Sequence, residues 1–206
     1  MIRQVGEAAL LVETGALEVS HRLDRLLREE RPAGVAEIVP GPETVLVVAP
    51  DADLAKLGTR LTALLDTART PRSGVGGDDA GLVTVPVVYD GQDLDDVARL
   101  TGLSPGEVVA RHCGSELVVG WLGFAPGFAY LTGLDPALHV PRLDTPRTFV
   151  PAGAVAIAGP HAAVYPAASP GGWRLLGHTT LPVWDTHADP PAVLRPGMRV
   201  RFEATS

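Results

Sequence analysis

Residues 120–136 read GWLGFAPGFAYLTGLDP, residues 141–159 read PRLDTPRTFVPAGAVAIAG and residues 165–179 read YPAASPGGWRLLGHT. In these stretches, short apolar runs are separated by glycine, proline and aromatic residues. Short strands with regular turn signals between them are typical of closed β architectures. We therefore predict a closed or nearly closed β-barrel that carries these glycine-rich segments as ordered loops. Its strands are expected at residues 117–122, 155–158, 163–165, 173–176 and 198–202.

The segment just before these stretches is expected to add one strand and two short helices. The strand is predicted at residues 82–88, and the helices are predicted at residues 93–100 and 104–112. The second helix has a clear start signal, because Ser104 is placed as its N-cap and Glu107 completes a capping box.

Aromatic residues divide the chain into two parts. The first tyrosine is Tyr89, and every tryptophan and phenylalanine comes after it, so the earlier part must build its core from aliphatic side chains. Apolar periodicity there predicts a small α+β domain in the order β-α-β-β-α. Its strands are expected at residues 8–12, 35–39 and 44–49, and its helices at residues 17–30 and 54–65. The second of these helices is expected to be capped by Asp51 or Asp53.

Residues 69–81, RTPRSGVGGDDAG, carry no hydrophobic periodicity and many turn-forming residues. We interpret them as an exposed linker or long loop. The predicted organisation is therefore an α+β N-terminal domain at residues 1–80 and a β-barrel domain at residues 81–206, with no internal repeat that relates the two.

The composition excludes several classes of protein. The chain has 206 residues, a formal net charge of −7 and no basic stripe, so nucleic acid is not an expected partner. The single cysteine, Cys113, excludes an internal disulfide and a multi-cysteine metal site, and no metal ligands are predicted. Cys113 is either a nucleophile or a packed residue, as most free cysteines are. The only lysine is Lys56, and the absence of a Gly-x-x-x-x-Gly-Lys-Ser/Thr motif excludes a P-loop ATPase.

Neither a signal peptide nor a membrane span is predicted. The N-terminal sequence MIRQVGEAALLVE has charged residues within a short apolar run, unlike a signal peptide. No apolar run approaches the ~20 residues needed to cross a bilayer. We therefore expect a cytoplasmic protein that does not act at a membrane.

Ordered motifs in these stretches carry a resemblance to one family. The chain is similar to the allophanate hydrolase subunit 1 family, which includes the B-type subunit of bacterial 5-oxoprolinase and the sporulation-kinase inhibitor KipI. The resemblance covers nearly the whole chain. Its motifs are GFAPGF at 123–128, YL at 130–131, PR at 141–142, TPR at 145–147, VPAG at 150–153, IAG at 157–159, YP at 165–166, SPGGW at 169–173, and Gly177 before Thr179.

The resemblance implies an α+β N-terminal domain followed by a cyclophilin-like β-barrel domain. It also implies the B-type subunit of an ATP-dependent 5-oxoprolinase, which hydrolyses the lactam amide of 5-oxoproline to glutamate only together with a C-type and an A-type subunit. ATP, with Mg²⁺, is then expected to bind jointly with the C-type subunit, which has a related barrel. The alternatives are a KipI-like inhibitor of a sensor histidine kinase and an allophanate hydrolase subunit 1. Barrel shape alone gives only weak support for peptidyl-prolyl isomerase activity.

Four basic residues are the candidate catalytic residues: His112, Arg142, Arg147 and His178. An arginine fork holds a carboxylate or a phosphate through paired charge-assisted hydrogen bonds. The alternative for both arginines is a surface ion pair with Asp135 or Asp144. Histidine titrates near neutral pH and suits acid–base catalysis, whereas a histidine at the end of a helix, such as His112, also suits a structural role.

The candidate residues for binding substrate or ATP are mostly aromatic residues, hydroxyl-bearing residues and glycines of the same stretches. Aromatic side chains either wall a pocket or fill a barrel core. Glycine-rich turns either bind an anion through backbone N–H groups or simply reverse the chain. The set comprises Phe124, Pro126, Gly127, Phe128, Tyr130, Pro151, Gly153, His161, Tyr165, Ser169, Gly171, Gly172, Trp173 and Thr179.

Three departures from the pattern of the family affect the expected substrate. Ala154 stands where a serine is usual, His161 and Ala162 stand where Gln-Thr is usual, and His178 stands where an arginine is common. If these positions line the pocket, polar contacts have been lost and imidazoles gained. The substrate would then differ from that of the relatives.

Overall fold

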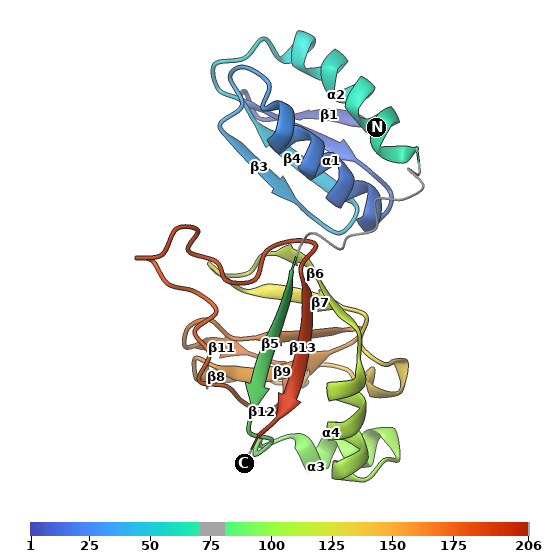
Figure 1. The fold of residues 1–206 in the computed structure, drawn as a ribbon, viewed down its shortest axis with the longest axis vertical. Coiled ribbons are helices and arrows are strands. Elements are labelled where there is room, and N and C mark those ends of the chain that lie inside the picture. The colour runs from blue at the N-terminus through green and yellow to red at the C-terminus, as the bar shows by residue number, and fades with distance from the viewer. Residues whose placement is uncertain (71–80, 206) are drawn as a thin grey trace. The chain divides into compact units, whose positions relative to one another are not determined.

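The computed structural model describes residues 1–70 and 81–205. The chain forms two compact units, Met1–Gly76 and Gly77–Ser206 (Figure 1). Each unit has its own hydrophobic core. Most of the predicted linker, and the predicted boundary between residues 80 and 81, fall on residues 71–80, which lie outside the described residues.

The first unit is a four-stranded antiparallel sheet in the order β1-β2-β4-β3, with two helices on one face (Figure 1). Its elements are β1 (Ile2–Val5), β2 (Ala9–Glu13), α1 (Leu17–Glu30), β3 (Glu37–Pro40), β4 (Thr44–Val48) and α2 (Leu54–Arg69). The α+β prediction is confirmed, but the predicted element order omits strand β1. This edge strand is exposed apart from Ile2, so its sequence carries no apolar alternation.

The core of the first unit is aliphatic. Alternate strand residues, such as Val45, point to one face of the sheet and pack with helix residues such as Leu23. Helix α2 begins after Asp53, whose carboxylate accepts two backbone N–H groups of the first helical turn at 3.1 Å. Asp53 is therefore the helix cap, and Asp51 is not.

The second unit is a seven-stranded sheet that forms a nearly closed barrel, and this confirms the predicted barrel. The strand order is β12-β9-β10-β7-β6-β13-β5. Neighbouring strands are antiparallel, except that β13 and β5 are parallel. The strands are β5 (Leu82–Val87), β6 (Leu117–Leu122), β7 (Ala129–Thr132), β9 (Ala154–Ala158), β10 (His161–Val164), β12 (Arg174–His178) and β13 (Arg199–Ala204).

Helices and a two-stranded sheet complete the second unit. They are α3 (Leu94–Thr101), α4 (Pro105–Gly114), the 3-10 helix η2 (Pro136–Leu138), and the paired strands β8 (Arg147–Val150) and β11 (Ser169–Gly171). Helix α4 packs on β13 and α3 packs on β12 (Figure 1). The predicted capping box of Ser104 and Glu107 is present at the start of α4. Strands β7, β8 and β11 lie in segments for which the sequence predicts loops, because glycines and prolines flank these short strands.

The barrel closes at a seam between its two edge strands, β12 and β5. Val88, directly after β5, exchanges two backbone hydrogen bonds of 2.9 Å with His178 of β12. Gly177 allows this approach, because a Cβ atom at this position would lie 2.1 Å from the carbonyl oxygen of Val88. The seam therefore depends on a residue that has no side chain.

Strand β9 is buried on both faces, and it separates the barrel interior from a second cluster of buried residues. Val155 and Ile157 belong to the barrel core. The alternating residues Ala154, Ala156 and Ala158 face the other way, because successive side chains of a strand point to opposite faces. These small side chains leave room for a layer of aromatic rings. The buried rings of this layer are Phe128, Tyr165 and Trp173.

Candidate functional site

A pocket of about 230 Å³ lies over this aromatic layer. Three segments that are distant in the sequence meet there: the turn into β7, the loop before β8, and the stretch from the end of β10 to the start of β12. The lining residues are Phe124, Phe128, Tyr130, Arg142, Pro146, Tyr165, Pro170, Gly171, Gly172 and Trp173.

Phe128 is the centre of the aromatic layer. Its ring lies edge-to-face with Tyr130, Tyr165 and Trp173, at centroid distances of 5.2, 5.3 and 5.5 Å. Contacts of this geometry add about 0.5–1.5 kcal/mol each beyond the burial of the rings. Because Phe128 is only 1% exposed, it supports the other three rings as one packed wall of the pocket.

Arg142 is the one charged residue among those that line the pocket. Its guanidinium carbon lies 5.8 Å from the centroid of the Trp173 ring, which is a cation–π distance. Arg142 forms no ion pair with any residue in the described part of the chain. Asp135, one of its two expected partners, instead accepts a hydrogen bond from Arg111 at 2.8 Å. The guanidinium is therefore available to an anionic ligand.

Phe124 stands in an unusual conformation in the pocket wall. It is 64% exposed, and its φ of 69° lies in the left-handed region that disfavours residues with side chains. Its ring packs edge-to-face on Phe128, with 5.2 Å between the two ring centroids. Backbone strain of this kind is concentrated at ligand-binding and catalytic sites.

Arg147, a predicted catalytic residue, does not line the pocket. One of its terminal nitrogens donates to the buried carboxylate of Asp93 at 2.7 Å. The other carboxylate oxygen of Asp93 accepts the backbone N–H of Leu175 at 2.7 Å. The predicted ion-pair partners, Asp135 and Asp144, were therefore wrong for Arg147. Arg147 in β8 is therefore linked, through the carboxylate of Asp93, to the start of β12.

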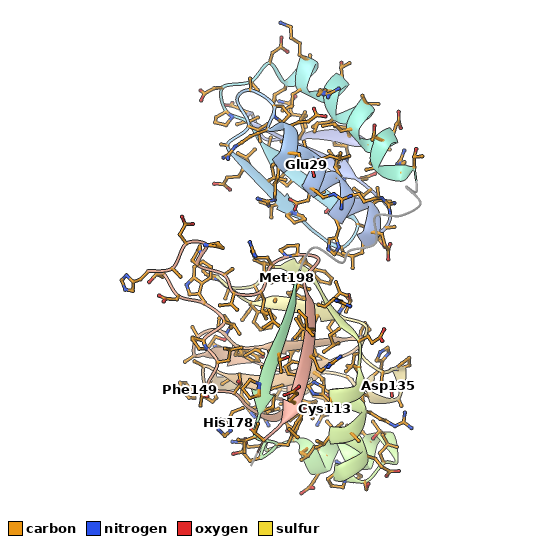
Figure 2. All side chains as sticks on the ribbon, in the orientation of Figure 1. Glu29, Cys113, Asp135, Phe149, His178 and Met198 are labelled. Atoms are coloured by element: carbon orange, nitrogen blue, oxygen red, sulfur yellow. The ribbon has the colours of Figure 1, made fainter. Side chains whose placement is uncertain are left out.

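His112 lies in the barrel core, away from the pocket. Its ring is fully buried, stacks on Phe202 at 4.4 Å and shares a 2.7 Å hydrogen bond between Nδ1 and the hydroxyl of Tyr89. The same hydroxyl lies 3.3 Å from the sulfur of Cys113, which is labelled beside α4 in Figure 2. Burial lowers the pKa of His112 to about 3. His112 and Cys113 therefore suit a packing role, and not the acid–base or nucleophilic roles considered above.

The burial of His112 predicts a loss of stability in acid. Below pH 6.5 the unfolded chain binds a proton on this residue, whereas the folded chain does not until pH falls to about 3. The contribution of His112 to the free energy of unfolding is therefore present above pH 6.5 and is lost as the pH falls toward 3. Between pH 6.5 and 4.5 the free energy of unfolding should fall by about 2–3 kcal/mol. Urea unfolding at both pH values measures the loss.

The matched variants for this measurement are His112→Phe and His187→Gln. His112→Phe should have a smaller acid loss than the wild type, by about 2–3 kcal/mol. His187 is exposed, so His187→Gln should keep the loss of the wild type. An unchanged acid loss in His112→Phe would contradict the assignment.

The other two candidate histidines also lie outside the pocket lining. His178, labelled in Figure 2, is at the barrel seam, where its Nδ1 is 2.8 Å from a carboxylate oxygen of Asp90. His161 lies behind the pocket wall and contacts Trp121 and Tyr130 edge-on, at 5.1 and 5.9 Å between centroids. Burial lowers the pKa of His161. The two imidazoles do not form a joint site with the pocket.

The remaining predicted binding residues shape the backbone around the pocket and do not line it. Gly153 donates its N–H to the carbonyl oxygen of Tyr165, and its own carbonyl accepts the N–H of Thr179, both at 2.8 Å. The Thr179 hydroxyl accepts the N–H of Leu181 at 3.1 Å. The other residues of the set outside the lining are Pro126, Gly127, Pro151 and Ser169.

Sequence reasoning missed two lining residues, Pro146 and Pro170. Both lie inside motifs that the resemblance rests on: Pro146 in TPR at 145–147, and Pro170 in SPGGW at 169–173. The motifs themselves were therefore the signal, although a proline carries neither a polar nor an aromatic side chain.

The departures from the family pattern do not change the pocket wall. Ala154 is 2% exposed and lies beneath the aromatic layer, and Ala162 is fully buried in the barrel core. His161 and His178 lie outside the lining, as described above. None of these four positions lines the pocket, so they give no reason to expect a substrate different from that of the relatives.

The described part of the chain contains neither a metal-binding cluster nor a membrane-spanning helix. Among residues 1–70 and 81–205, no group of three or more His, Cys, Asp or Glu side chains is placed to hold a metal ion. Over the same residues, no helix has both the length and the apolar character that a membrane span requires.

Residues 1–194 match the family described as carboxyltransferase domain, subdomain C and D. The chain is 39% identical over 208 residues to the B-type subunit of 5-oxoprolinase from Escherichia coli O157:H7, and the match covers 96% of this chain and 93% of the relative. It is 45% identical over 124 residues to the B-type subunit of 5-oxoprolinase from Bacillus subtilis (strain 168), and this match covers 59% of this chain and 52% of that relative.

Among solved structures, the chain is similar to TTHA0988. The TM-score is 0.80 and the identity is 37%, over the whole of this chain and 40% of TTHA0988. The chain thus spans less than half of TTHA0988, whereas the local match to the Bacillus subtilis relative covers between half and three fifths of each protein.

Proposed function

The chain belongs to the family of the carboxyltransferase domain, subdomain C and D, and with that as premise we propose that it is the B-type subunit of an ATP-dependent 5-oxoprolinase-type complex. Relatives named as the B-type subunit of 5-oxoprolinase match the chain at 39–45% identity. The proposed reaction is hydrolysis of the lactam amide of 5-oxoproline to glutamate, and this chain supplies part of the substrate site.

The observation that carries the proposal is the pairing of one free guanidinium with a wall of aromatic rings. 5-Oxoproline is a small, flat lactam ring with one carboxylate. Arg142 offers a fork for the carboxylate, and the Trp173 and Tyr130 rings offer flat apolar surface for the ring. A pocket of about 230 Å³ suits a ligand of this size.

The described residues of this chain do not by themselves fit ATP. The pocket is smaller than the ~300–1,000 Å³ of typical ligand sites, and Arg142 is the only cationic side chain in its lining. Lys56 lies in the first unit and is 87% exposed. We therefore propose that ATP, with Mg²⁺, is held mainly by a partner subunit.

That partner is proposed to be a C-type subunit, with an A-type subunit completing ring opening. Two observations support a multi-subunit arrangement. The chain matches only 40% of TTHA0988, so most of that chain has no counterpart here. Phe124 and Phe149, the latter labelled in Figure 2, are each 64% exposed on the barrel unit, and a partner surface would remove this apolar area from water.

The test is reconstitution. This chain is purified together with candidate C-type and A-type subunits, and glutamate and ADP are measured with and without 5-oxoproline. ADP and glutamate that both depend on 5-oxoproline support the proposal, and omission of this chain should abolish both products. A folded three-subunit mixture that forms no glutamate would overturn it, and inhibition of a sensor kinase would become the next assay.

A further inference from the structure

Every polar side-chain group that lines the pocket can donate a hydrogen bond. These groups are the guanidinium of Arg142, the hydroxyls of Tyr130 and Tyr165 and the indole N–H of Trp173, and no carboxylate or carboxamide is among the lining side chains. Guanidinium has no acceptor, and a neutral phenol donates one proton. The pocket therefore suits a ligand rich in oxygen acceptors, and it opposes a ligand that brings an ammonium group next to Arg142.

The backbone of Tyr165 is fixed on both sides. Its N–H donates to the carbonyl oxygen of Ala154 at 2.9 Å, and its own carbonyl oxygen accepts the N–H of Gly153 at 2.8 Å. The ring packs edge-to-face on Phe128 at 5.3 Å, and the residue is only 1% exposed. The phenol oxygen therefore has one well-defined position in the pocket wall.

The hydroxyl of Tyr165 keeps its proton at neutral pH. Burial outweighs the opposing effect of the backbone N–H of Trp173 on the pKa of Tyr165. Burial raises the pKa of Tyr165, so the phenol stays protonated at neutral pH. Gly171 lies against this oxygen, and only a glycine fits there, because a Cβ atom at this position would lie 2.3 Å from the hydroxyl. The phenol is thus a neutral group of the pocket lining that has a proton to donate.

We propose that the Tyr165 hydroxyl recognises the ring carbonyl of the cyclic amide, while Arg142 holds its carboxylate. This inference rests on the proposed function and deepens it, because it makes Tyr165 the residue that selects a lactam. Proline has the same ring and carboxylate but carries a ring ammonium and no ring carbonyl. Glutamate carries an ammonium and a second carboxylate. Neither ligand offers an acceptor to Tyr165 without placing a cation close to Arg142.

The test is a binding measurement on the full chain, separate from any activity of the complex. Saturation-transfer NMR with 5-oxoproline, proline and glutamate, at concentrations up to tens of millimolar, gives a Kd for each ligand. The wild type should bind 5-oxoproline at least tenfold more tightly than proline or glutamate. Tyr165→Phe should weaken 5-oxoproline binding about tenfold and leave proline binding unchanged, because it removes only one hydrogen bond.

Tyr89→Phe is the matched control. It also removes one tyrosine oxygen, but it does so beside His112 and outside the pocket lining, so ligand selectivity should match the wild type. Thermal unfolding of each variant verifies that the chain is folded. Wild-type binding of proline as tight as that of 5-oxoproline, no detectable 5-oxoproline binding, or unchanged selectivity in Tyr165→Phe would overturn the inference. Failure of the proposed function would instead appear as selective binding without glutamate formation in the reconstituted complex.

Discussion

Replacing Arg142 with glutamine is expected to lower kcat/KM of the reconstituted complex for 5-oxoproline between a hundredfold and a thousandfold. The variant removes the only cationic side chain from the pocket lining, so the carboxylate of the ligand would lose its counter-charge. Loss of one partner from a hydrogen-bonded charge pair costs about 2–5 kcal/mol, and each tenfold change in affinity corresponds to about 1.4 kcal/mol.

A second ligand distinguishes binding of the carboxylate by Arg142 from binding of the lactam ring by the pocket. 2-Pyrrolidinone has the lactam ring but no carboxylate, so Arg142→Gln should bind it as the wild type does. Arg111→Gln is the control, because Arg111 is an exposed arginine paired with Asp135 outside the pocket. Its activity should stay near that of the wild type. If Arg142→Gln lost affinity for both ligands equally, Arg142 would act by supporting Trp173 and not by binding a carboxylate.

Replacing Gly177 with alanine is expected to destabilise the barrel unit by about 3–5 kcal/mol. The new Cβ atom would lie 2.1 Å from the carbonyl oxygen of Val88 and 2.9 Å from the Cα atom of Tyr89. Both are backbone atoms, so the clash is relieved only if the seam opens. Overpacking costs about 1–3 kcal/mol, and two lost hydrogen bonds add about 1 kcal/mol each.

Urea denaturation followed by circular dichroism measures this loss. Gly106→Ala is the matched control, because Gly106 lies in helix α4 and its Cβ would meet nothing within 4 Å. That variant should gain about 0.5–1 kcal/mol from the better helix propensity of alanine. Equal stability of the Gly177→Ala and wild-type chains would show that the seam tolerates a side chain.

The elements with strong local signals were predictable from the sequence. Helix α1 occupies residues 17–30, as its apolar periodicity predicts, and α4 begins at its capping box. Strand β1 was missed because an exposed edge strand shows no apolar alternation. Strands β8 and β11 were missed because prolines flank or interrupt them, and their pairing depends on a contact between distant segments.

The candidate site was predictable in its aromatic and arginine content, but not in the partners of its charged residues. Motif order pointed to Arg142 and the aromatic wall. No local pattern joins Arg147 to Asp93, which precedes it by 54 positions. Arg147 was therefore predicted to bind a ligand anion, although its guanidinium is already paired within the chain. His112 likewise appeared as a helix-end histidine, because its burial arises from the packing of α4 on the distant strand β13.

The position of β13 constrains the order in which the second unit can form during synthesis. Strand β13 pairs in parallel with β5 on one side and antiparallel with β6 on the other. Residues 82–87 are made early but meet their sheet neighbour only when residues 199–204 have been made. Pairing over such a sequence distance is slow, and an unpaired strand edge invites aggregation. The first unit, whose strands all pair within residues 2–48, can fold much earlier, whereas β5 stays without its sheet neighbour until β13 has been made.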